Sequence, residues 1–167
     1  MVDTLTPARL WKRLPPEQRL SVARAFWQDE DAADDQVQAA LLIAQQKKFR
    51  PKTVIALDEE RKARHLSTIV TLPENLAARA LIVYHLAAQR PMMGKFLDAV
   101  GIAHEDGVIK DDEVKPEAEK VSRAAEEIAS QFPAADVSLY FNTLFCQDPQ
   151  TWGGLEHVIR ERDWVIG

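Results

Sequence analysis

Residues 73–90 read PENLAARALIVYHLAAQR, and this stretch decides the fold. Wound at 3.6 residues per turn, it is apolar over most of its circumference. A helix of that kind is surrounded by other elements on nearly every side. Its polar side chains fall on one narrow stripe formed by Asn75, Arg79, Gln89 and Arg90, with His85 at the border. We therefore expect a bundle built around a central buried helix at about 73–90.

Prolines divide the rest of the chain into further helices. The sequence contains nine prolines and six glycines, and most of the prolines stand where a helical pattern begins. The clearest pattern follows Pro116, where Val121, Ala124, Ala125 and Ile128 have the i, i+3, i+4, i+7 spacing of one buried helix face. Strand patterns are nearly absent. The sequence thus predicts an all-α fold, a single domain over residues 1–167 with seven to nine short helices.

Two glycine positions give more local predictions. Residues 102–115, IAHEDGVIKDDEVK, are expected to form the one real loop, in which Gly107 adopts a positive φ and Ile109 packs inward. The pair Gly153-Gly154 lies inside the last expected helix, where glycine costs stability. We interpret this pair as the mark of a tight helix crossing.

A faint internal similarity provides an alternative architecture. Residues 89–100, QRPMMGKFLDAV, and residues 147–158, QDPQTWGGLEHV, share Gln, Pro, Leu and Val in register. Such an echo is typical of a short helical-repeat array. Because the matches are few and involve common helix residues, the bundle is the preferred prediction.

Composition limits the class of protein. The net charge of −5 argues against a dedicated nucleic-acid binder, and no apolar run approaches the roughly 20 residues that span a bilayer. The single cysteine, Cys146, excludes an intramolecular disulfide, and the N-terminal residues lack a secretory-signal pattern. We expect a cytoplasmic protein without a membrane segment, for which nucleic acid is an unlikely partner.

One candidate site can be assembled from residues separated in sequence. None of the four histidines is spaced i+3 or i+4 from another or from Cys146, so neither a metal nor a cofactor is expected. A ligand site can combine His85, Arg90 and Arg79 of the central helix with His104 of the loop. In this hypothesis His85 is a general base or ligand contact and Arg90 holds an anion. The alternative is that His85 is hydrogen-bonded and partly buried without a functional role.

A second candidate is the basic segment at 47–64. Its positive residues are candidates for phosphate or nucleic-acid contact. The segment has seven positive residues, of which Lys47, Lys48, Arg50, Lys52, Arg61 and Arg64 are the candidates and Lys62 is the seventh. Acidic residues at 58–60 interrupt the segment, so a solvated charged face explains it equally well.

No specific function can be derived from these patterns. By elimination, the leading expectation is a non-catalytic helical module for protein interaction or regulation, whose partner is another protein or a second copy. The alternative is a small-molecule-binding protein or enzyme with a pocket near His85, Arg90 and His104. The second alternative is weak phosphate or nucleic-acid binding through the basic segment.

Overall fold

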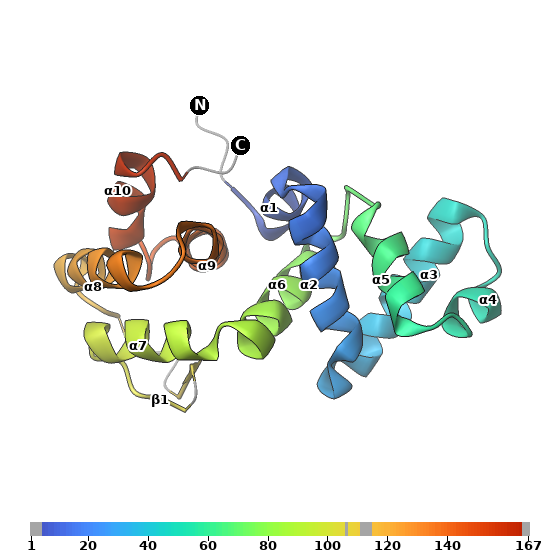
Figure 1. The fold of residues 1–167 in the computed structure, drawn as a ribbon, viewed down its shortest axis with the longest axis horizontal. Helices are drawn as coiled ribbons and strands as arrows, with labels where there is room; N and C mark the ends of the chain where they lie inside the picture. Colours follow the sequence, from blue (N-terminus) through green and yellow to red (C-terminus); the bar gives the residue numbers. More distant parts are fainter. Residues whose placement is uncertain (1–4, 106, 111–114, 165–167) are drawn as a thin grey trace. The chain divides into compact units, whose positions relative to one another are not determined.

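The computed structural model describes residues 5–105, 107–110 and 115–164. Within these residues the fold is all-α, as predicted, with ten α-helices, one 3₁₀ turn and a single two-stranded sheet (Figure 1). The elements are α1 (Pro7–Arg13), α2 (Pro16–Gln28), η1 (Glu30–Ala32), α3 (Ala33–Lys47), α4 (Pro51–Ile55), α5 (Glu59–Ser67), α6 (Glu74–Ala88), α7 (Arg90–Val100), β1 (His104–Glu105), β2 (Val108–Ile109), α8 (Ala118–Gln131), α9 (Ala134–Gln147) and α10 (Gly154–Glu161).

The chain divides into two compact units. Thr6–Tyr84 forms the N-terminal unit, and the chain from His85 onwards belongs to the C-terminal unit. The boundary lies inside α6, so this helix contributes side chains to both units. That residues 1–167 form a single domain stays a prediction.

The central helix predicted at 73–90 corresponds to α6, which ends at Ala88. Arg90, expected on this helix, lies instead in the first turn of α7, because the helix breaks at Gln89 before Pro91. One broad face of it is buried, as expected from its composition, and consists of Leu76, Ala77, Ala80, Leu81 and Val83. Ile82 faces outward. His85 is fully buried, although the helical projection places it at the border of the polar stripe.

The helix count exceeds the predicted range by one, and the chain between Pro51 and Ser67 forms two separate short helices. Pro51 begins α4, and that helix ends at Ile55. Asp58 then begins α5 by accepting a hydrogen bond from the Arg61 backbone N–H, with 2.8 Å between Oδ1 and N. A side-chain cap of this kind satisfies one of the amides that a helix leaves unpaired at its start.

The N-terminal unit is held partly by side chains that bind backbone carbonyls. The Trp11 indole donates from Nε1 to the Ile69 carbonyl at 2.8 Å. Arg19 on α2 donates from Nε to the Ser67 carbonyl at 3.0 Å and from a terminal nitrogen to the Leu14 carbonyl at 3.0 Å. These contacts fasten α2 and α1 to the end of α5, and α2 lies alongside α5 in Figure 1.

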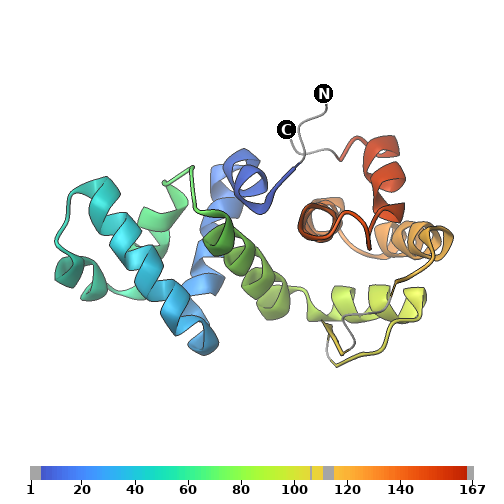
Figure 2. The same ribbon diagram turned by 180° about the vertical axis from the view of Figure 1, so that it is seen from behind.

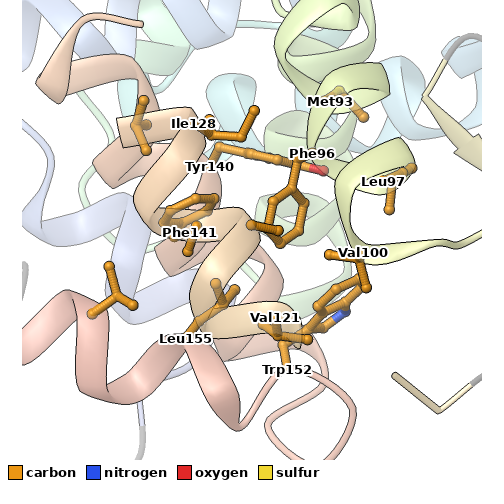
Figure 3. Packing of buried hydrophobic residues seen from close by; sticks show 14 of the residues in the cluster. Met93, Phe96, Leu97, Val100, Val121, Ile128, Tyr140, Phe141, Trp152 and Leu155 are labelled. Carbon is orange, nitrogen blue, oxygen red and sulfur yellow. The ribbon is translucent and has the colours of Figure 1, made fainter. Parts of the chain in front are cut away.

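The core of the C-terminal unit is aromatic and centres on Phe96 of α7 (Figure 3). Its ring centroid lies 5.8 Å from that of Tyr140, 5.1 Å from Phe141 and 5.7 Å from Trp152. Tilted and edge-on ring pairs at such distances are favourable beyond the area they bury. Phe96 thereby joins α7 to α9 and to the turn before α10.

Helices α8 and α10 cross closely at Gly154, as the glycine pair predicts. The pair lies at the start of α10, however, and not inside the helix as expected. A Cβ on Gly154 would lie 2.5 Å from the Ala118 carbonyl oxygen and 3.0 Å from the Val121 Cβ. The Ser122 hydroxyl donates to the Gly154 carbonyl at 2.9 Å in the same crossing. The predicted buried face of α8 is also confirmed, since Val121 and its three partners at 124, 125 and 128 are all buried.

The segment expected as a loop contains the two-stranded sheet. His104 pairs with Ile109, and Glu105 with Val108, in antiparallel register. Strands of two residues are too short to produce an alternating pattern, which is why the sequence did not predict them. The positive φ of Gly107 is confirmed at 90°, and Ile109 packs against the core as expected.

The internal sequence similarity does not correspond to similar local structure. Residues 90–100 form α7 directly after Gln89, whereas the residues after Gln147 form a turn and α10 begins only at Gly154. Of the two prolines that the segments share, Pro91 therefore lies in the first turn of α7, whereas Pro149 lies in the turn before α10.

Candidate ligand-binding cleft

Helix α7 separates its side chains into two faces. The buried face consists of Met92, Met93, Phe96, Leu97 and Val100. The opposite face lines a cleft of about 320 Å³ together with His104. The lining residues are Arg90, Pro91, Gly94, Lys95, Asp98 and His104. All of them belong to the C-terminal unit.

The end of α7 directs His104 back to this face. Gly101 adopts the left-handed conformation with φ of 88°, and its backbone N–H donates to the Leu97 carbonyl at 3.0 Å. A glycine with positive φ is the usual residue after the last turn of a helix. The chain then reverses, Ile102 is buried, and β1 lies beside α7 (Figure 1).

Hydrogen bonds define the tautomer of the His104 ring. The backbone N–H of Gly107 donates to Nδ1 at 3.1 Å, so this nitrogen carries no proton. The proton therefore sits on Nε2, which donates to Asp98 Oδ1 at 2.7 Å. With only 13% of its side chain exposed, the His104 ring is fixed as a wall of the cleft.

Two glycines make room for this ring. A Cβ on Gly94 would lie 3.4 Å from His104 Cε1, so the ring rests almost directly on the α7 backbone. Gly107 has a positive φ, and a Cβ there would lie only 3.0 Å from the Cβ of Met93. A side chain at Gly107 would be strained by the positive φ and would crowd Met93, whereas a Cβ at Gly94 would make an ordinary contact with the His104 ring.

The cleft carries both positive and negative charge. Arg90 lies in the first turn of α7, and its Nε donates to the Leu86 carbonyl at 2.7 Å. Lys95 places its ammonium 5.5 Å from the centroid of the Phe132 ring. Asp98 contributes a carboxylate whose side chain is largely exposed. The α7 N-terminus adds the positive end of a helix dipole next to Arg90.

His85 lies away from this cleft, in the core of the C-terminal unit. Its side chain is 1% exposed, and its ring centroid is 5.4 Å from that of Tyr140. The Thr143 hydroxyl lies 3.0 Å from Nε2 and itself donates to the Leu139 carbonyl at 2.7 Å. Burial lowers the pKa of His85 to about 3, because the protonated ring loses its hydration.

Arg79 belongs to the N-terminal unit. Its Nε lies 3.4 Å from an Asp35 carboxylate oxygen, and a terminal nitrogen donates to the Asp31 carbonyl at 3.2 Å. Of the four residues grouped from the sequence, the structure thus brings Arg90 and His104 to one cleft. His85 and Arg79 have other surroundings.

The basic segment at 47–64 is partly neutralised by nearby carboxylates. Arg64 pairs with Glu60 at 3.1 Å, and Arg61 lies 3.7 Å from an Asp58 carboxylate oxygen. Four other cations cluster around the end of α3 and the start of α4: Lys47, Lys48, Arg50 and Lys52. Lys62 lies in α5, with its ammonium 5.4 Å from the centroid of the Trp27 ring. Lys47 also lines a cleft of about 210 Å³ with residues 68–71.

Four residues of the candidate cleft were not predicted from the sequence: Pro91, Gly94, Lys95 and Asp98. Gly94, Lys95 and Asp98 recur at spacings of three to four residues after Arg90 and Pro91, and so share a helix face with them. The helical spacing alone could have predicted that these residues share a face. The position of His104 could not be predicted in this way, because it depends on the chain reversal after Gly101.

Neither metal-binding geometry in the described residues nor a likeness to known proteins assigns a ligand to this cleft. Across the described part of the chain, no three His, Cys, Asp or Glu side chains are grouped so as to hold a metal ion. The helices in that part include none with the length and apolarity needed to cross a membrane. Comparisons with protein-family models, curated proteins and solved structures give no match.

Proposed function

We propose that this chain is a non-catalytic binding protein that holds a small molecule with an anionic group in the α7 cleft. The observation that carries the proposal is that residues from two different elements line one cleft. Arg90, Lys95 and Asp98 come from α7, and His104 comes from β1. Convergent polar groups in a concave site are the usual indication of ligand binding.

The hydrogen bonding of the histidines supports binding rather than proton transfer. A general base needs a lone pair within reach of the substrate. In His104 the Nδ1 lone pair accepts a hydrogen bond from the Gly107 backbone N–H, and the Nε2–H group donates a hydrogen bond to Asp98. His85 is enclosed in the core. Neither ring presents a basic nitrogen to a molecule in the cleft.

Charge and size indicate the class of ligand. The Arg90 guanidinium, whose Nε donates to the Leu86 carbonyl, supplies the positive charge that attracts a carboxylate or phosphate. Asp98 lies on the same helix face and favours a hydroxyl or ammonium group on the opposite end of the ligand. A volume of about 320 Å³ is at the lower limit of ligand pockets, so the ligand is small. That the protein binds this ligand in the cytoplasm stays a prediction.

The test is a titration followed by ¹H–¹⁵N NMR, with inorganic phosphate, citrate and glutamate as probes. Binding in the cleft is expected to shift the amide signals of Gly94 and Gly107, which line or border it. Arg90→Gln is expected to weaken binding of the active probe at least about tenfold, a loss of roughly 1.4 kcal/mol.

Arg123→Gln is the matched control. It removes the same charge from an exposed site on α8, where Arg123 pairs with Glu119. Retained binding in this variant, with loss in Arg90→Gln, supports the proposal. Equal weakening in both variants, or no probe that shifts either glycine signal, contradicts it.

A further inference from the structure

Helix α3 carries an exposed stripe with an apolar centre. Asp34, Val37, Leu41, Gln45 and Lys48 follow one another at intervals of three, four, four and three residues, and all are exposed. Such spacing keeps them on one helix face. Val37 and Leu41, one turn apart at the centre, are 54% and 49% exposed. Figure 2 shows α3 at the near side of its unit, with no other helix drawn in front of it.

The ends of this helix have opposite charge. Glu30, Asp31 and Asp34 gather at the start of α3. Lys47 and Lys48 stand at its end, and Arg50 and Lys52 follow directly. The surface therefore changes from acidic through apolar to basic along one helix of 15 residues.

We propose that α3 pairs antiparallel with α3 of a second copy of this chain. A two-fold axis near the centre of the helix places Val37 and Leu41 against the same two residues of the other copy. It also places the acidic start of each helix opposite the basic end of its partner. A two-fold interface repeats every contact, so each favourable charge pair is formed twice.

The pattern selects a second copy over an unrelated partner because the surface is complementary to itself. Val37 and Leu41 alone would fit many partners. The acidic start and basic end of α3 add a requirement, because the partner must present a basic group opposite the start and an acidic group opposite the end, as an antiparallel copy of α3 does. Parallel pairing would bring like charges together. One helix face buries less area than a standard interface, so the dimer is expected to be weak and concentration-dependent.

Sedimentation velocity of the full chain, from about 10 μM to about 1 mM, measures the association. Val37→Lys is expected to raise the dissociation constant at least about tenfold, because it places a charge at the apolar centre. Val108→Lys is the matched control, since Val108 is 47% exposed on β2, in the other unit. This control is expected to associate like the unaltered chain.

A charge-swapped pair tests the antiparallel arrangement. Lys47→Glu with Lys48→Glu cancels the positive charge at the end of α3, where Arg50 and Lys52 remain, and Glu30→Lys with Asp34→Lys cancels most of the negative charge at its start. Each double variant alone is expected to be monomeric, whereas an equimolar mixture associates. Circular dichroism of each variant first establishes that it is folded.

Three outcomes overturn the proposal. The first is an unaltered chain that is monomeric throughout the concentration range. The second is equal weakening by Val37→Lys and Val108→Lys. The third is a mixture of folded charge-swapped variants that stays monomeric. None of these outcomes bears on the α7 cleft, whose ligand is tested separately.

Discussion

His85 donates a hydrogen bond from Nε2 to the hydroxyl oxygen of Thr143 across 3.0 Å inside the C-terminal unit. The direction follows from Thr143, whose single hydroxyl proton is used in its 2.7 Å bond to the Leu139 carbonyl. Thr143 can therefore only accept from the ring. His85 is consequently neutral and protonated on Nε2, in agreement with the low pKa that burial gives it.

This buried neutral histidine predicts that the protein loses stability in mild acid. The pKa of His85 is about 3 in the folded chain, below the ordinary value of 6.5, so between these values only the unfolded chain binds the proton. Stability therefore falls as the pH decreases from 6.5 towards 3. At pH 5 the loss from this residue is about 2 kcal/mol relative to pH 8. Urea unfolding at several pH values measures it.

His85→Gln is the matched variant, because an amide can still donate to Thr143 and does not titrate in this range. Its stability at pH 8 is expected to be lower than that of the unaltered chain, since the Tyr140 ring loses its neighbour. Between pH 8 and pH 5, however, the difference between the two proteins narrows. A difference that stays constant over this range contradicts the assignment of His85 as the titrating group.

The crossing of α8 and α10 predicts opposite tolerance at two adjacent glycines. Gly154→Ala places a methyl group 2.5 Å from the Ala118 carbonyl oxygen, which is backbone and cannot rotate away. Overpacking of this kind costs about 1–3 kcal/mol. We expect a lower urea midpoint and no change in helix content at low urea concentration.

Gly153→Ala is the control for that prediction. Its Cβ would lie 3.3 Å from the Pro149 carbonyl oxygen, and Gly153 is exposed with a helical φ of −54°. We expect a change within about 1 kcal/mol, because a small adjustment relieves the contact. If the two alanine variants are equally unstable, loss of glycine flexibility explains the effect better than the helix crossing does.

The sequence predicted most of the helical architecture because its signals are local. Pro7, Pro16 and Pro91 each stand in the first turn of a helix. The period of the apolar residues in α8 identified its buried face without knowledge of its neighbours. Asp58, which caps α5, is a further local signal, although it does not reveal the separate short helix α4 before it. The two strands of the hairpin were not predicted, because two residues are too few to show an alternating apolar pattern.

The candidate cleft was less predictable because it depends on contacts between distant segments. Arg90 and the other α7 residues share a face by helical spacing alone. His104 joins them only because Gly101 reverses the chain and the Gly107 amide orients the ring. The sequence made His85 a candidate ligand contact, but in the structure Thr143 and Tyr140 of α9 pack against its ring. A partner 58 positions along the chain leaves no signal in the spacing around His85.

The end of α3 gives a third prediction, which concerns backbone conformation. Lys48 has φ of 59°, in the left-handed region, where its Cβ crowds the following carbonyl. Lys48→Gly removes that strain, whereas Lys48→Ala removes the same charge and keeps the strain. We expect the glycine variant to be more stable than the alanine variant by about 1 kcal/mol, a difference of roughly 2–4 °C in Tm. Thermal unfolding of both proteins in 0.5 M NaCl, which weakens charge effects, makes the comparison. An alanine variant at least as stable as the glycine variant would show that the turn after α3 carries no such strain.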